Sequence, residues 1–202
     1  MTPEAIEQLY DEFHTPVHIR AHCFEVARIG KLLAEKLNKK GQNIDADLVW
    51  IAGMLHDLVR VVDFTNLDPN LGTDEDQWIW KKLRETYKET HHGIAAGEIL
   101  VKIGEAKLAD IIKRHAFGSI GTPEGPQDWE SKLLYYADKR VAHDQCVSLQ
   151  SRLDEARIRH NGPIEKTDKQ AQIEEKIHQL ESEIFKTLDF KPSDLLQLLG
   201  EN

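Results

Sequence analysis

Apolar residues recur at helical spacing along almost the whole chain. From Val17 to about Asn38 they stand three or four positions apart, which predicts an amphipathic helix with one buried face. Thr15 followed by Pro16 predicts an N-cap with proline at the first helical position, and Gly41 predicts the end of this helix. The apolar positions of the face are Ile19, Cys23, Val26, Ala27, Ile29, Leu32, Leu33 and Leu37.

The same spacing predicts further helices and no series of strands. Asp45 or Asp47 can cap a second helix that continues through Leu55 and His56. The remaining helices are expected at about 75–90, 92–103, 105–115, 128–160 and 164–187, with a short one in the closing segment KPSDLLQLLG. Residues 161–163, Asn-Gly-Pro, should break the chain between the last two long helices, and the segments 64–77 and 116–127 are rich in turn formers. We therefore predict an all-α fold.

The last forty residues are more charged and less apolar than the rest. We expect a helical domain over residues 1–162 and a helical appendage over residues 163–202 that packs on it. The appendage carries an apolar stripe that suits packing on the long helix or, as a weaker hypothesis, on a second copy in a homodimer. The stripe consists of Ile173, Ile177, Leu180 and Ile184.

Composition narrows the class of protein. The 202 residues are 40% hydrophobic and 30% charged, enough apolar content for a real core. No apolar run is long enough for a membrane span, and the acidic, amphipathic start does not resemble a secretory signal. Two cysteines, Cys23 and Cys146, do not make a disulfide framework, so we expect a reduced, cytoplasmic setting. The formal charge of −9 argues against a broad nucleic-acid surface, but it permits a small anionic substrate if the site supplies local positive charge.

Six histidines and aspartates are spread through the predicted helices as candidate metal ligands. Any one alone is more often a hydrogen-bonded, partly buried residue. Two observations set this group apart: His56 and Asp57 are adjacent, and Asp138 lies in the apolar segment LLYYADKRV, although aspartate is rarely buried unless it is paired or bound to a metal. Imidazoles together with carboxylates suit a divalent transition metal. The set is His22, His56, Asp57, His92, His115 and Asp138.

The order and context of this set resemble those of the HD-domain metal-dependent phosphohydrolases, over roughly residues 15–145. The segment VHIRAHCFEVARIGKLLAE resembles the family's first helix, and AGMLHDLVR resembles the segment with the His-Asp doublet. HHGIAAGEIL and IIKRHAFG resemble the two extra histidine segments of the two-metal members, and SKLLYYADKRV resembles the final aspartate segment. The resemblance implies an HD-domain-like helical bundle.

The resemblance also implies an arrangement of ligands. One metal would be held by His22, His56, Asp57 and Asp138, and a second by His92, His115 and Asp57, with Asp57 bridging. A pair of metals activates a water as the nucleophile and grips phosphoryl oxygens, which gives Asp57 a catalytic role. One or two divalent ions are expected, and iron or manganese fits the mixed ligands best, while zinc, nickel and cobalt remain compatible.

Several cations are candidates for binding the substrate phosphate. Arg60 stands where many family members have lysine, although Val59 replaces a glycine common before it, and we assign Arg60 a catalytic and substrate-binding role. Lys139 and Arg140 directly follow Asp138. His18 could pair with His22 in a rival metal site, but contact with the substrate is the role we favour.

Two further choices concern neighbouring residues. His91 and His92 are alternative ligands. His92 fits better the family-like sequence pattern of a histidine followed by glycine and small residues. Cys23 next to His22 is interpreted as a buried thiol rather than as a nucleophile, because neighbours on a helix point apart.

The expected function is hydrolysis of a phosphomonoester, phosphoanhydride or phosphodiester of a nucleotide-like small molecule by a metal-bound hydroxide. Within the two-metal branch, a mononucleotidase or a hydrolase of a symmetric dinucleoside tetraphosphate is favoured. The alternative is a non-catalytic nucleotide-binding regulatory module on the same fold. Substrate specificity is expected to come from the loops 64–77 and 116–127.

Overall fold

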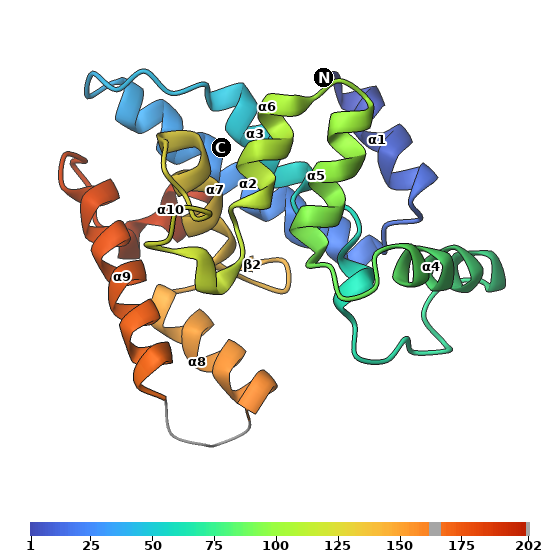
Figure 1. Cartoon of the computed structure of the whole chain (residues 1–202). Helices are drawn as coiled ribbons and strands as arrows, with labels where there is room; N and C mark the ends of the chain where they lie inside the picture. Colours follow the sequence, from blue (N-terminus) through green and yellow to red (C-terminus); the bar gives the residue numbers. More distant parts are fainter. Residues whose placement is uncertain (162–166, 201–202) are drawn as a thin grey trace.

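A computed structural model of the chain describes residues 1–161 and 167–200. These residues form ten α-helices, three short 3-10 helices and one two-stranded antiparallel ladder, so the predicted all-α fold is confirmed (Figure 1). The α-helices are α1 (Pro3–Glu12), α2 (Val17–Asn38), α3 (Ala46–Leu55), α4 (Asp74–Thr86), α5 (His92–Lys102), α6 (Ala106–Lys113), α7 (Trp129–Asp138), α8 (Leu149–Asn161), α9 (Asp168–Phe185) and α10 (Leu195–Gly200). The others are η1 (Arg60–Asp63), η2 (Phe117–Ser119), η3 (Pro192–Asp194), β1 (Val141–Ala142) and β2 (Gln145–Cys146).

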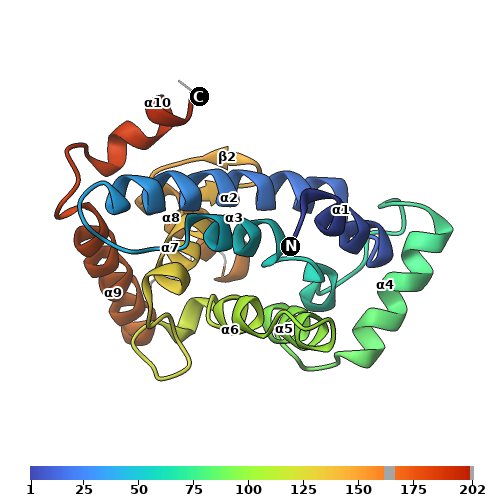
Figure 2. The ribbon, with the colours of Figure 1, turned by 90° about the horizontal axis from the view of Figure 1, so that it is seen from above.

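The long helix α2 is the centre of the core, and α3 and α7 pack along it (Figure 2). Gly53 on α3 lies directly against the backbone of α2, since a Cβ atom at this position would come within 2.5 Å of the Cα atom of Ala27. The absence of a side chain therefore sets how closely the two helices approach. A close approach matters here because the chain leaves α3 two residues later, at the His-Asp doublet.

A pair of helices, α5 and α6, forms a second layer next to this core (Figure 2). The Lys113 side chain crosses α5 at Gly97, where a Cβ atom would lie 2.4 Å from the Cε atom of Lys113. The apolar face of α6 is buried through Leu108, Ile111 and Ile112. The two layers bring the start of α5 and the end of α6 towards the ends of α3 and α7.

The prediction of one long helix over residues 128–160 is wrong. Asp128 caps α7 as an N-cap should, with its carboxylate accepting from the Ser131 N–H, but α7 ends at Asp138 and the β1–β2 hairpin intervenes before α8. His143 in the turn has φ of 56°, a left-handed conformation that no α-helix accommodates. The apolar spacing gave no warning, because Val141 and Cys146 are buried as strand residues at positions that also fit a helix.

The start of α2 also differs from the prediction. Pro16 itself is the N-cap residue, and it offers no side-chain hydrogen bond. The Thr15 hydroxyl instead donates to the Leu58 carbonyl oxygen at 2.7 Å, which fastens the start of α2 to the segment after the His-Asp doublet. The helix α1, capped by Thr2, was not anticipated from the sequence.

The apolar stripe of α9 packs within the chain. Ile177, Leu180 and Ile184 are buried, and α9 contacts α7, where the Tyr136 hydroxyl donates to Glu181 at 2.6 Å. The expected packing of this helix on the preceding segment is therefore seen on α7, while the predicted break at 162–163 and the helix start at 164 lie outside the described residues. In Figure 1, α8 and α9 lie side by side at one end of the molecule and α4 projects at the other.

Over the described ranges, no helix is both long and apolar enough to cross a membrane.

Gly53→Ala should destabilise the fold, because the added methyl group must push α2 and α3 apart. Overpacking of this kind costs about 1–3 kcal/mol of unfolding free energy. Urea denaturation of the purified variant measures the loss. Gly118→Ala is the matched control, since its Cβ would meet nothing within 4 Å, and it should stay within about 0.5 kcal/mol of the parent. Equal midpoints for the two variants would show that the helix approach does not depend on Gly53.

Candidate metal centre

The six candidate ligands converge from five helices. His22 lies on the buried face of α2, and the other five residues lie at helix ends. The doublet follows the last residue of α3, so it sits in a turn rather than on the helix as predicted. His92 begins α5, His115 follows α6, and Asp138 is the last residue of α7. Four of the six are at least 93% buried, namely His56, Asp57, His92 and His115.

Each of the four imidazoles is held by a hydrogen bond at its Nδ1 atom. In three of them this atom lies against a backbone carbonyl oxygen: His56 against Gly53 at 2.8 Å, His115 against Ile112 at 2.6 Å, and His22 against His143 at 2.8 Å. In the fourth, His92, it lies against the carboxylate of Asp63. A carbonyl or carboxylate oxygen requires an N–H donor at Nδ1, so the unprotonated Nε2 atom of each neutral ring is the one that can bind a cation.

The first group of ligand atoms consists of His22, His56 and Asp138. The Oδ1 atom of Asp138 lies 3.2 Å from His22 Nε2 and 3.6 Å from His56 Nε2. The Nε2 atom of His56 is completely buried and has no hydrogen-bond partner among the described residues. A buried nitrogen lone pair without a partner is costly, and a cation between these three atoms removes that cost. The residues therefore fit a bound metal.

The second group consists of His92, His115 and Asp57. The two Nε2 atoms are 2.8 Å apart, and His92 Nε2 lies 2.8 Å from Asp57 Oδ1. Both imidazoles use Nδ1 as the donor to an oxygen, so in their neutral forms two nitrogen lone pairs face each other. Only a positive charge between them, a proton or a metal ion, makes that arrangement favourable.

Asp57 lies between the two groups. Its Oδ1 atom is 2.8 Å from His92 Nε2, 3.8 Å from His115 Nε2 and 3.7 Å from His56 Nε2. The rings of His56 and His115 are 5.2 Å apart and perpendicular, so the groups are direct neighbours. One carboxylate can therefore serve both, which is the geometry that the resemblance implied for a bridging ligand.

The protonation states suit metal binding. Burial opposes ionisation of Asp57, but His56 and His92 outweigh it and hold the pKa of this carboxyl well below its ordinary value. For Asp138, Lys139 and His22 outweigh burial in the same way and lower its pKa. Burial, reinforced by His92 and His56, lowers the pKa of His115. At neutral pH the site thus offers ionised carboxylates and a neutral His115, the forms that bind metals. Burial opposes a charge on His56, but Asp57 outweighs it and raises the pKa of this ring well above its ordinary value, so a metal bound at His56 would take the place of a proton.

Asp63 is a site residue that the sequence analysis missed. Its carboxylate accepts from the His92 backbone N–H at 3.2 Å, contacts the His92 Nδ1 atom, and accepts from Arg60 at 2.9 Å. A carboxylate behind a ligating histidine fixes the ring and raises its basicity. The sequence offered one signal, the position of Asp63 six residues after the doublet. This spacing can be interpreted only when the course of the chain through η1 is known.

The predicted substrate cations separate into two sets. Arg60 and Lys139 line the pocket, and Lys139 also donates to Asp138 Oδ2 at 2.7 Å and to the His115 carbonyl oxygen at 2.9 Å. Arg140 points away from the pocket: its guanidinium donates to Val147, Tyr136 and Pro192, so it fastens α7 to the hairpin and to the C-terminal segment. The structure does not bring Arg140 to the other site residues.

Two other histidines border the site. His18 lines the pocket, and burial together with His143 lowers its pKa. His91 is the N-cap of α5, with Nδ1 accepting from the Gly93 N–H at 3.1 Å, and burial and His92 lower its pKa to about 4. The ring of His91 is close enough to His92 and His115 to offer a third nitrogen, but the short contact to Asp57 belongs to His92.

The surroundings of Gly93 explain why His92 is followed by a residue without a side chain. A Cβ atom at this position would lie 2.6 Å from the Cε1 atom of His115. The ring of His115 therefore occupies the space that any side chain at position 93 would need.

All six candidate ligands except His56 open onto one cavity of about 910 Å³. From the two loops expected to set specificity, the cavity receives Phe64, Ala116 and Phe117. Residues of α8 and α9 also line the cavity, although the sequence analysis did not assign these helices to the site. The cavity is large enough for a substrate much bigger than a phosphate group.

Comparison with known proteins agrees with this geometry. The family model described as HD domain matches residues 19–143 of the chain. The chain is similar to the protein named "Uncharacterized protein MJ0778" of Methanocaldococcus jannaschii. The two are 28% identical over 147 residues, which cover 62% of this chain and 71% of the relative. No solved structure matches the chain.

Asp63→Asn should weaken metal binding at the group that contains His92. The amide keeps the shape of the side chain but loses the charge that orients the His92 ring, and loss of such a partner typically lowers metal affinity by roughly 10–100-fold. Metal content after dialysis against a competing chelator measures the change. Asp144→Asn is the control, because Asp144 also lines the cavity and should leave metal content unchanged. Parental affinity in Asp63→Asn would remove the orienting role.

Proposed function

The chain belongs to the HD-domain family, whose members are generally metal-dependent phosphohydrolases, and from this premise we propose that it hydrolyses a phosphate ester or anhydride of a small, nucleotide-like molecule. The observation that carries the proposal is the buried, unpartnered Nε2 atom of His56 facing Asp138 and Asp57. A fold does not keep such a cluster for stability alone, because an apolar core would cost less.

In this proposal His22, His56, Asp57 and Asp138 hold one divalent ion, and His92, His115 and Asp57 hold a second. Ions bound there would supply an activated water as nucleophile and would neutralise charge on the phosphoryl oxygens. Iron or manganese is the proposed metal, since imidazole and carboxylate are mixed in both groups. Two groups of potential ligands in the structure, one of His22, His56 and Asp138 and one of His91, His92 and His115, support a metal centre here, and Asp57 Oδ1 lies 2.8 Å from His92 Nε2.

The side chains around the ions have separable tasks. Asp57 holds the two groups at a fixed separation, and Lys139 keeps Asp138 turned with Oδ1 towards the histidines by binding its Oδ2 atom. Arg60 lies at the edge of the cavity, with its Nε atom 3.6 Å from Asp57 and its NH1 group on Asp63. From that place its guanidinium can bind phosphoryl oxygens in a bidentate manner and orient the substrate.

A regulatory module that binds a nucleotide without cleaving it is the competing function. Such a module needs a pocket for the nucleotide but does not need a complete set of metal ligands. Here the six predicted ligands lie close together, and Asp57 Oδ1 is 2.8 Å from His92 Nε2 and 3.7 Å from His56 Nε2. This completeness supports an enzyme over a module.

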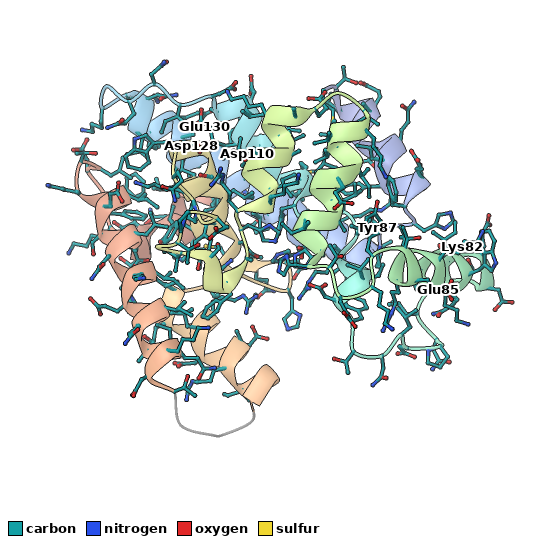
Figure 3. All side chains as sticks on the ribbon, in the orientation of Figure 1. Lys82, Glu85, Tyr87, Asp110, Asp128 and Glu130 are labelled. Atoms are coloured by element: carbon teal, nitrogen blue, oxygen red, sulfur yellow. The ribbon has the colours of Figure 1, made fainter. Side chains whose placement is uncertain are left out.

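Asp57→Asn should abolish turnover and reduce bound metal, because an amide cannot supply the negative charge that both groups share. We expect a loss of kcat/KM greater than about 100-fold, beyond the range for an orienting residue. The assay is a panel of nucleotides and phosphate esters with purified, metal-analysed protein. Asp110→Asn is the matched control: Asp110, labelled in Figure 3, lies on α6 with a largely exposed side chain bound to Arg114, and its activity should match the parent.

The same panel separates the two functions. Protein that contains metal and turns over at least one phosphate compound is an enzyme. Metal-free protein that binds nucleotides with no turnover is the regulatory module. Parental turnover in Asp57→Asn would contradict the proposed mechanism outright.

A further inference from the structure

The cavity extends beyond the metal centre into a space walled by α8 and α9. We call this space the C-terminal lobe; its wall consists of Arg152, Leu153, Ala156 and Arg157 on α8 and Gln170 and Glu174 on α9. The four α8 residues lie at spacings of one, three and one, so they share one face of the helix. The lobe and the candidate ligands line the same cavity, and α8 and α9 are seen together in Figure 1.

The wall is built by chain that the family match does not include. The match ends at residue 143, whereas the lobe begins at residue 152. The two parts are nevertheless joined firmly, because Arg152 donates through Nε to the Val141 carbonyl oxygen at 2.7 Å. The matched part thus supplies the candidate ligands, and a segment outside the match supplies another part of the wall of the same cavity.

The chemistry of the lobe favours an uncharged occupant. Its middle is apolar: Leu153 is buried and Ala156 is half-buried, and the aromatic side chain of Phe117 lines the same cavity. The two arginines are each matched by an acid on their own helix, Arg152 with Glu155 at 2.9 Å and Arg157 with Asp154 at 2.8 Å. These pairs leave the wall without a large net positive charge, so its apolar middle is the feature that can select an occupant.

Polar groups frame this apolar middle without covering it. Gln170 and the 6% exposed Glu174, one turn apart on α9, also line the cavity. An amide such as that of Gln170 beside an apolar surface suits a flat ring with a polar edge, because the ring packs on the apolar part and its N–H or hydroxyl group meets the amide.

We propose that the C-terminal lobe binds the uncharged part of the substrate that carries a ring, so that the protein selects esters of the size of a nucleoside monophosphate over small phosphate esters. This inference rests on the proposed phosphohydrolase function. It assigns the choice of substrate to α8 and α9, and chiefly to the surface around Ala156.

Ala156→Phe tests the lobe by filling it. The variant should lower kcat/KM for nucleoside 5′-monophosphates by roughly 10-fold or more, mostly through KM, because it removes binding of the body and leaves the reacting groups in place. Hydrolysis of methyl phosphate, which has no body to bind, should stay within about two-fold. Ile158→Phe is the matched control: it adds bulk on the same helix at a side chain that is 60% exposed, and it should change neither substrate.

The outcomes distinguish this inference from the proposed function. If the parent hydrolyses methyl phosphate and nucleoside monophosphates equally well, or if Ala156→Phe lowers both alike, the lobe does not bind the body although the hydrolase stands. A preference for nucleoside diphosphates over monophosphates that is lost in Arg157→Gln would also overturn it, since the lobe would then bind a second phosphate.

If the parent hydrolyses nothing, the proposed function fails and the lobe is tested by binding instead. Calorimetry with metal-loaded protein and adenosine 5′-monophosphate should then show binding in the parent and in Ile158→Phe, and at least about 10-fold weaker binding in Ala156→Phe. Equal binding in all three proteins would overturn the inference.

Discussion

The site depends on one repeated interaction, the hydrogen bond that holds the Nδ1 atom of each imidazole. Three of these bonds go to backbone carbonyl oxygens, which are themselves fixed by helix ends and by a hairpin, and the fourth goes to Asp63. Because Nδ1 makes this bond, Nε2 is the ring atom that faces the other site residues, and the rings cannot turn without losing the bond. The backbone, the most rigid part of the chain, thus largely fixes where the Nε2 atoms of these rings lie.

Helix ends are well suited to this task. The last carbonyl groups of a helix have no partner within the helix, so they are free to accept from a side chain that follows. His56 and His115 do this three residues after the carbonyls of Gly53 and Ile112. The layers of the fold then need only bring helix ends together, and glycines at positions 53 and 93 provide the close approach that this requires.

The sequence predicted the parts of the site that depend on order along the chain. The all-α class and the helices that carry the candidate ligands followed from apolar spacing, and the six candidate ligands, which lie close together in the structure, were chosen from their order and context. Asp63 could not be found in this way, because its role depends on how η1 turns the chain back towards His92. Arg140 was assigned to the substrate because it follows Asp138, yet its side chain serves the packing of the C-terminal segment. The hairpin was missed since its buried residues also fit helical spacing.

The hairpin between β1 and β2 has a consequence for how this chain can vary. Surface turns ordinarily tolerate insertions, because nothing depends on their exact length. Here the carbonyl oxygen at the tip, on His143, is the partner of His22. One extra residue would displace that oxygen by about 3.3 Å, more than the length of the bond it makes. The length of this turn therefore sets the position of His22. Among natural relatives, we expect the length of the turn to vary as little as the identity of the six candidate ligands.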